Sequence, residues 1–120
     1  MATATQLIAV ATRRFESEVP ALVRLKLVLR LELRGRGDVQ VFRVRVPGPE
    51  VTKGEPNDAR LQVTMSRSHF NQLAEKGKLR DWREAYERGQ IKVAGDPEVR
   101  RLIGQVIERH EQRARLKKVR

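Results

Sequence analysis

The clearest pattern along the chain is a strict alternation of leucine with other residues between positions 25 and 34. Leucine occupies every odd position from Leu25 to Leu33, and charged residues with a single valine occupy the positions between them. A period of two is typical of a strand with one buried and one solvated face. The pattern therefore predicts a sheet with helices on one side only.

A second strand is expected directly after this one. Gly35–Asp38 supplies a turn, and Val39–Val46 is rich in valine, so the pair is typical of a hairpin. The alternation is less regular here, because Val39 and Val41 stand on the face that should be wet. A bulge or a partly covered face near Val41 would reconcile the pattern. Further strands are expected at residues 51–53, 59–65 and 90–94.

Apolar residues at helical spacing predict four helices. The first covers residues 5–19 and ends at Pro20. Ser66 is suited to be the N-cap of the second, which ends at Gly77, and a third spans Leu79–Arg88. Asp96 and Pro97 are suited to start the last helix, whose apolar stripe runs to His110.

The order of these elements predicts the fold class. A helix precedes a run of strands, two short helices follow, and a single strand and a long helix end the chain. Helices separated from strands, with one sheet face polar, indicate an α+β domain of two layers. A length of 120 residues suits one such domain, which we expect over residues 1–112. Residues 113–120 form a basic tail that is expected to fray.

The amino-acid composition limits the partners and the chemistry that are expected for this chain. Lys and Arg number 26 against 15 Asp and Glu, a net charge of +11 that favours an anionic partner. There is no cysteine, which excludes disulfides and thiolate chemistry in this chain. The apolar stretch near the N-terminus is too short for a signal peptide, so a cytoplasmic protein is expected.

The positive charge is expected to gather on the wet face of the sheet. There Glu32 would be the one acid among the basic residues of the first two strands: Arg24, Lys26, Arg30, Arg34, Arg43 and Arg45. Such a patch can bind an anionic membrane or granule surface or an acidic protein. It can equally be a solvated face that discourages sheet stacking. Aromatic residues are missing from this face, which disfavours base stacking but leaves phosphate contacts to nucleic acid open.

No catalytic set emerges from the sequence. Ser66 and Ser68 lie near His69, but Ser66 suits a helix cap better than a nucleophile. His69 and His110 do not have the spacing of metal ligands. We therefore expect neither an enzyme nor a bound cofactor or metal.

The second half of the chain resembles a known family. A strand ends in Met65-Ser66, a helix with Phe70 and Leu73 follows, and Gly77-Lys78-Leu79 makes a turn. Gly89-Gln90-Ile91-Lys92-Val93-Ala94-Gly95-Asp96 then leads into the last helix. This order is similar to that of sterol carrier protein type-2 domains, and the resemblance covers most of the chain. It implies a two-layer fold with a mixed five-stranded sheet whose helices cover one face.

The same resemblance implies an apolar cavity between sheet and helices that holds a fatty acyl chain, a sterol or another lipid. By position its lining would come from Leu27, Leu29, Met65, Phe70, Leu73, Trp82, Tyr86, Ile103 and Val106. The alternative is that these residues pack a solid core, since protein interiors are normally close-packed. Three functions follow: a lipid or acyl-chain carrier, an accessory domain that docks on an acidic partner, and a nonspecific nucleic-acid binder.

Overall fold

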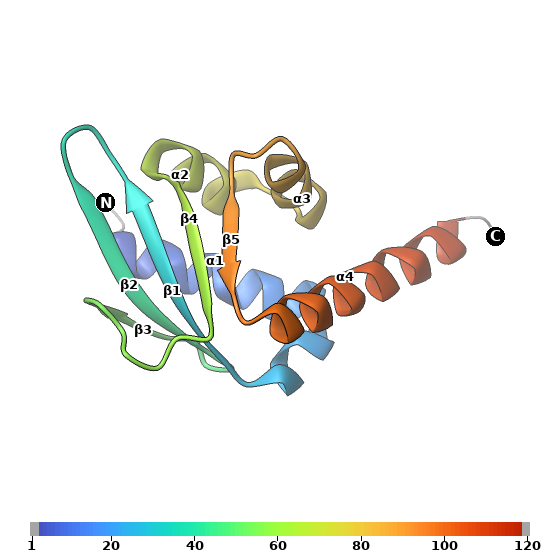
Figure 1. Cartoon of the computed structure of the whole chain (residues 1–120). Coiled ribbons are helices and arrows are strands. Elements are labelled where there is room, and N and C mark those ends of the chain that lie inside the picture. The colour runs from blue at the N-terminus through green and yellow to red at the C-terminus, as the bar shows by residue number, and fades with distance from the viewer. Residues whose placement is uncertain (1–2, 119–120) are drawn as a thin grey trace.

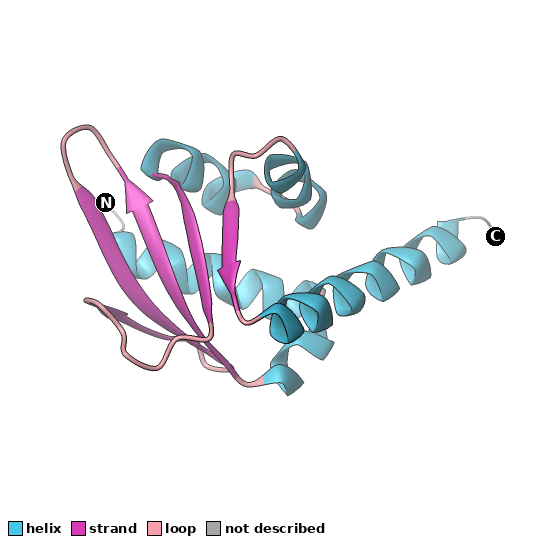
Figure 2. Ribbon diagram, in the orientation of Figure 1, coloured by secondary structure: helices cyan, strands magenta, loops and turns pink. Residues whose placement is uncertain are grey.

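The computed structural model describes residues 3–118, and a mixed five-stranded sheet forms its centre (Figures 1 and 2). The strands are β1 (Leu27–Arg34), β2 (Val39–Val46), β3 (Glu50–Lys53), β4 (Leu61–Ser66) and β5 (Lys92–Gly95). Their order across the sheet is β3-β2-β1-β4-β5. β1 and β4 run parallel, and the other neighbours run antiparallel. The α+β fold class and the mixed sheet are confirmed.

Helices cover one face of this sheet. They are α1 (Ala4–Glu18), the 3-10 helix η1 (Pro20–Leu25), α2 (Arg67–Lys76), α3 (Leu79–Glu87) and α4 (Pro97–Lys118). Figure 1 shows α1 crossing behind the strands, with α2 and α3 together near the upper ends of β4 and β5. The opposite face of the sheet carries no helix in this view, as the leucine alternation in β1 predicted.

The main core lies between the sheet and α1. Leu33 and Phe42 from the sheet and Ile8 from α1 are almost completely buried in it. The predicted cap of α2 is confirmed, since the Ser66 hydroxyl accepts a hydrogen bond from the backbone N–H of His69 at 3.2 Å. Gly77 ends this helix in an extended conformation. A side chain there would come within 2.5 Å of the Leu73 carbonyl oxygen, so close approach explains the glycine.

The first strand begins later than its sequence pattern predicts. Pro20 ends α1 but also opens η1, in agreement with the preference of proline for the first turn of a helix. Lys26 has a φ of 48° and turns the chain, so the strand starts at Leu27. The prediction that Arg24 and Lys26 lie on the wet face of this strand is therefore wrong.

The hairpin of β1 and β2 has no bulge. Its register runs unbroken from the pair Leu27 and Val46 to the pair Arg34 and Val39. Val41 is half-buried on the outer face, opposite Glu32. Of the two alternatives proposed for this strand, the partly covered face is the one found.

The last helix is only loosely attached to the domain. Asp96 caps it as predicted, with its carboxylate accepting from the Glu98 N–H at 2.9 Å. Of the apolar stripe, Val99 alone is buried, and Leu102 remains 37% exposed. Figure 1 shows α4 projecting away from the sheet, and it stays helical to Lys118. Fraying of residues 113–118 stays a prediction, and residues 119 and 120 lie outside the described part.

Candidate functional site

Part of the space between the inner face of the sheet and the helices α1 and η1 is hollow. This inner cavity has a volume of about 270 Å³. Its floor comes from alternate residues of the three central strands, such as Leu29, Val44 and Val63, and its roof includes Phe15 and Leu22. The space lies where the leucine alternation of β1 directs its apolar side chains.

The exposure of the central strands agrees with a hollow. Leu33 and Phe42 have 0% and 1% of their surface exposed, as expected for inner-face residues of a packed sheet. Leu29 and Val63 point to the same side of the same central strands and are only half-buried. Open space next to these two side chains accounts for their partial exposure.

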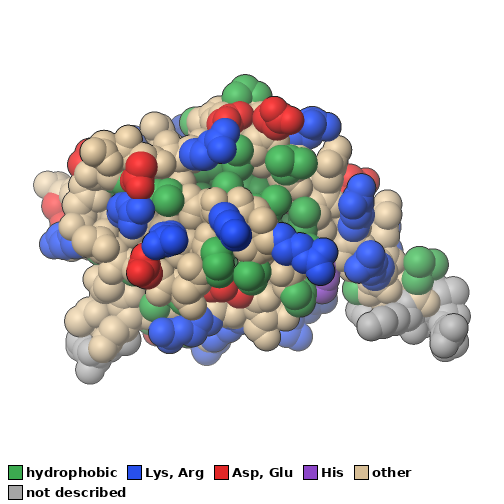
Figure 3. Space-filling model, turned by 90° about the horizontal axis from the view of Figure 1, so that it is seen from below, with side chains coloured by type: hydrophobic (Ala, Val, Ile, Leu, Met, Phe, Trp, Pro, Cys, Tyr) green, Lys and Arg blue, Asp and Glu red, His purple; other side chains and the backbone are tan. Residues whose placement is uncertain are grey.

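A second cavity of about 420 Å³ adjoins the first. It lies between α3, β5 and α4, and shares Phe15, Trp82 and Ile103 with the inner cavity as common wall. We call it the outer cavity, because charged side chains also line it: Arg83, Glu87, Arg100, Glu108 and Glu111. In the face seen in Figure 3, hydrophobic side chains gather near the centre, with Lys and Arg around them.

An ion pair connects the two helices beside the outer cavity. Arg83 of α3 donates to the Glu111 carboxylate of α4 and also to Glu87, the latter at 3.0 Å. These carboxylates, Glu111 foremost, raise the pKa of Arg83 above its usual value. The Arg83–Glu111 pair therefore connects α4 to α3 at this point.

Trp82 stands where the two cavities meet. Its ring makes edge contacts with Phe15 at 5.1 Å and with Phe70 at 5.9 Å between ring centroids. Aromatic pairs in this geometry are favourable beyond the area that they bury. Trp82 is also the single tryptophan of the chain, so its fluorescence reports on this position alone.

The structure places most of the predicted lining residues around these cavities. Six of the nine line the inner cavity: Leu27, Leu29, Met65, Phe70, Trp82 and Ile103. Tyr86 lines the outer cavity and is 49% exposed. Leu73 instead borders a narrow crevice next to Arg14, and Val106 is half-buried on α4 outside these cavities.

Residues of α1 were missing from the predicted lining. Ile8, Ala11 and Phe15 lie along one face of this helix and form part of the wall of the inner cavity. Their helical spacing was visible in the sequence, but nothing there placed α1 over the strands that bear the hollow.

Two polar residues of α1 also line the inner cavity. The Thr12 hydroxyl donates to the Ile8 carbonyl oxygen at 2.7 Å. One carboxylate oxygen of Glu16, Oε1, is buried and has no hydrogen-bond partner among the described residues. The other lining side chains are apolar, apart from the indole N–H of Trp82.

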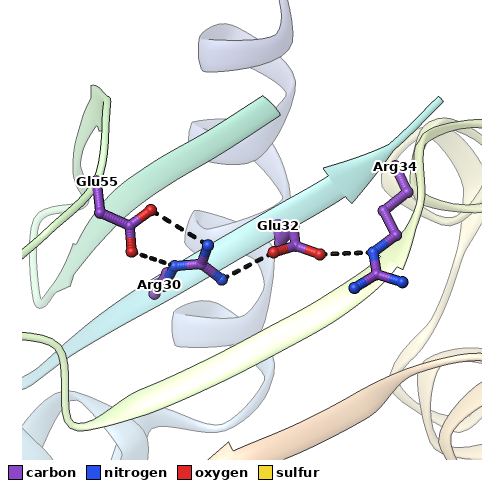
Figure 4. Close-up of polar contacts among 4 residues, drawn as sticks. All are labelled: Arg30, Glu32, Arg34 and Glu55. Atoms are coloured by element: carbon purple, nitrogen blue, oxygen red, sulfur yellow. Dashed lines mark hydrogen bonds and ion pairs between the residues drawn. The ribbon is translucent and has the colours of Figure 1, made fainter. Parts of the chain in front are cut away.

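The outer face of the sheet carries a network of ion pairs (Figure 4). Arg30 donates through Nε to Glu55 at 2.5 Å and through Nη1 to Glu32 at 3.0 Å. Arg34 donates to the other oxygen of Glu32 at 2.5 Å. The guanidinium groups of Arg34 and then Arg30 lower the pKa of Glu32, whose residue is only 9% exposed.

The remaining arginines of the predicted anionic-partner patch are paired as well. Arg43 bonds Asp58 at 2.7 Å and lowers the pKa of that carboxyl, while Arg45 bonds Glu50 at 3.2 Å. Glu32 is the one acid on the outer face of β1 and β2, as predicted, but acids from outside these two strands also reach this face. Arg30, Arg34, Arg43 and Arg45 are matched by nearby carboxylates, three of them from the chain between residues 50 and 58.

Neither a metal cluster nor a membrane-spanning helix is found in the part of the chain that the structure describes. Residues 3–118 contain no group of three or more His, Asp or Glu side chains placed to hold a metal ion. None of the helices within these residues is both long enough and apolar enough to cross a membrane.

Comparison with known proteins shows the fold. No family model and no curated protein sequence matches this chain. Palmitated SCP2L2 from Aedes aegypti has 18% identity and a TM-score of 0.57, with 83% of this chain and 93% of that chain covered. Sterol Carrier Protein 2 from Yarrowia lipolytica in its apo form has 22% identity and a TM-score of 0.54, with 78% of this chain and 87% of that chain covered.

The same fold also occurs inside a larger enzyme. The inverting sec-alkylsulfatase Pisa1 from Pseudomonas sp. matches 88% of this chain but only 16% of its own, with 17% identity and a TM-score of 0.53. Together these structures confirm the resemblance found in the sequence at the level of the fold. The chain has the sterol carrier protein 2 fold.

Proposed function

We propose that this protein is a non-catalytic module that binds a lipid or acyl chain in the two adjoining cavities. The observation that carries the proposal is the apolar hollow between the sheet and α1, continuous in its lining with the outer cavity. Volumes of about 270 and 420 Å³ together fall within the ~300–1,000 Å³ typical of ligand pockets. SCP2L2 of Aedes aegypti, which has this fold, was solved in a palmitated form.

The energetics of packing support a bound molecule. The apolar side chains around an inner cavity of about 270 Å³ lack packing partners on one side and forgo dispersion contacts there. An apolar chain that fills this space supplies those contacts, which gives the protein a reason to bind one.

Trp82 fluorescence provides the test. The native protein is titrated with dodecan-1-ol, and native mass spectrometry counts the molecules bound. We expect saturable one-to-one binding with a change in the emission of Trp82, because its ring lies in the wall of both cavities.

A cavity-filling variant connects the binding to the hollow. Val63 faces the inner cavity from β4, so Val63→Phe should weaken dodecanol binding by at least about tenfold, or ~1.4 kcal/mol. Val39→Phe is the matched control, because Val39 lies on the outer face and is 55% exposed. Absence of binding to the native protein, or equal binding by the two variants, would contradict the proposal.

A second candidate function is docking on an anionic membrane through α4. Arg109, Arg113 and Arg115 are exposed on the projecting half of this helix, and Leu116 beside them is 71% exposed. Basic residues near an anionic surface contribute about 1 kcal/mol each, and an apolar side chain can insert among the lipids. This arrangement would bring the cavities to a source of lipid.

Vesicle flotation tests this second function. We expect binding to vesicles with 30% phosphatidylserine and none to pure phosphatidylcholine, with loss of binding in Arg113→Gln/Arg115→Gln. Arg13→Gln/Arg36→Gln removes the same charge from exposed sites elsewhere and should bind normally. Equal loss in both double variants would indicate a general charge effect. Binding to an acidic protein or to nucleic acid without vesicle binding would favour one of the other predicted partners.

A further inference from the structure

The outer cavity is the open end of the two adjoining cavities. Every residue that lines the inner cavity is buried or half-buried. Six residues that line the outer cavity are exposed: Arg83, Tyr86, Glu87, Arg100, Gly104 and Glu108. A molecule that occupies both cavities therefore reaches solvent on the outer side, between α3 and α4, which lie on the same side of β5 in Figure 1.

Gly104 lies in the middle of the wall that α4 contributes to the outer cavity. The other residues of this wall are Arg100, Ile103, Ile107, Glu108 and Glu111. At 3.6 residues per turn, position 104 falls between Ile103 and Glu108 on the arc of the helix that faces the cavity. A side chain at this position would therefore project into the outer cavity.

Neither close packing nor backbone conformation requires a glycine at position 104. At Gly77 and Gly95 an added carbon would come within 2.5 Å of a carbonyl oxygen, whereas nothing described lies within 4 Å of such a carbon at Gly104. Gly104 also lies inside a helix and has no positive φ. Glycine forms helices more poorly than every residue except proline. What the missing side chain provides is open space in the outer cavity.

We infer that Gly104 determines the chain length that the protein accepts. The ligand is a long single-chain lipid, of which one part fills the inner cavity. The rest passes Trp82 and lies in the outer cavity against the bare backbone of α4 at Gly104. A short chain fits the inner cavity alone and does not depend on Gly104. The inference rests on the proposed function, because it assigns the residue that selects among the molecules that these cavities bind.

Two alcohols of different length test the inference. Octan-1-ol and hexadecan-1-ol share the same head, and Trp82 fluorescence with native mass spectrometry reports their binding at equilibrium. In Gly104→Leu an apolar side chain occupies part of the outer cavity. Each methylene that loses its apolar surroundings weakens binding about fourfold, so hexadecan-1-ol should bind this variant at least about tenfold more weakly. Octan-1-ol binding should stay within about twofold of the wild type.

Three further variants connect the length selection to this position. Gln105→Leu is the matched control, because it adds the same side chain at the next residue, which is exposed and does not line the cavity. It should bind both alcohols as the wild type does. Val63→Phe fills the inner cavity and should weaken binding of both alcohols. Gly104→Ala adds a single carbon, favours the helix, and should weaken hexadecan-1-ol binding less than Gly104→Leu does.

The outcomes separate this inference from the proposed function. If the wild type binds both alcohols and Gly104→Leu binds hexadecan-1-ol equally well, the inference is overturned and the lipid-binding function stands. The same holds if Gly104→Leu weakens both alcohols equally, if Gln105→Leu has the same effect, or if the wild type binds only octan-1-ol. If the wild type binds neither alcohol, the proposed function and the inference both fail.

Discussion

Glu32 offers a sharp test of how the open face of the sheet is stabilised. This carboxylate is nearly buried on a face without helices, and it bonds Arg30 on one side and Arg34 on the other (Figure 4). The substitution Glu32→Gln keeps the size of the side chain and removes the charge. We expect it to destabilise the protein, because two arginines lose a charged acceptor.

The magnitude follows from the exposure of the partners. Arg30 and Glu32 have side chains that are 20% and 11% exposed, and a charge-assisted hydrogen bond in such a place contributes about 1.5–3 kcal/mol. The side chain of Arg34 is 64% exposed, so its bond adds no more than about 1 kcal/mol. Because glutamine keeps one acceptor oxygen, we expect a loss of about 2 kcal/mol. For 120 residues this lowers Tm by roughly 8 °C.

The effect should depend on pH in a defined direction. The arginines hold the pKa of Glu32 below its usual value. The stabilisation is therefore complete above the ordinary glutamate pKa of about 4.3, and it is lost as the pH falls through the lower pKa of the folded protein. Asp58 also has a lowered pKa, but it is present in both proteins and cancels in their difference.

Thermal unfolding of the wild type and Glu32→Gln from pH 7 to pH 3 measures this difference. It should be largest at pH 7 and shrink below about pH 4. Glu50→Gln is the control on the same face, because the Arg45–Glu50 pair is exposed at both ends and contributes at most about 1 kcal/mol. Equal effects of the two variants, or a difference that is as large at pH 3 as at pH 7, would refute the reasoning.

Two glycine substitutions should have opposite signs in the same thermal assay. Gly95 has a φ of 120°, and a side chain there would lie 2.5 Å from the Arg60 carbonyl oxygen, so Gly95→Ala should cost at least about 1–3 kcal/mol. An unchanged Tm would contradict the backbone placed at this turn. Gly104 lies inside α4 with nothing within 4 Å of the added carbon, so Gly104→Ala should stabilise the protein by about 0.5–1 kcal/mol. A loss of stability there would indicate that α4 contacts its surroundings more closely than described.

Local features were accessible from the sequence because each depends on neighbours in the chain. The leucines of β1 identified the buried face of the sheet, since successive strand residues point to opposite sides. Ser66 and Asp96 marked the starts of α2 and α4, since a cap bonds to backbone N–H groups two or three residues away. The motifs around Met65 and Gly95 carried the resemblance to sterol carrier protein type-2 domains, and this resemblance predicted the whole fold. The structural comparisons confirmed that fold.

The charge on the open face could not be predicted in the same way. Alternation placed Arg30 and Arg43 correctly, but their partners Glu55 and Asp58 come from a loop whose path the pattern does not describe. These pairs are 25 and 15 residues apart in the chain. The net charge of +11 is unchanged by such pairing, but the face that was expected to display it is largely neutralised.

The amino-acid sequence by itself determined which side chains of β1 point inward, where α2 and α4 begin, and that the fold class is α+β. Only the tertiary structure decided that the inward side chains of Leu29 and Val63 line a hollow as well as packing against the core. The physical reason is that periodicity specifies the face of an element, whereas the volume between two layers depends on how far apart they settle.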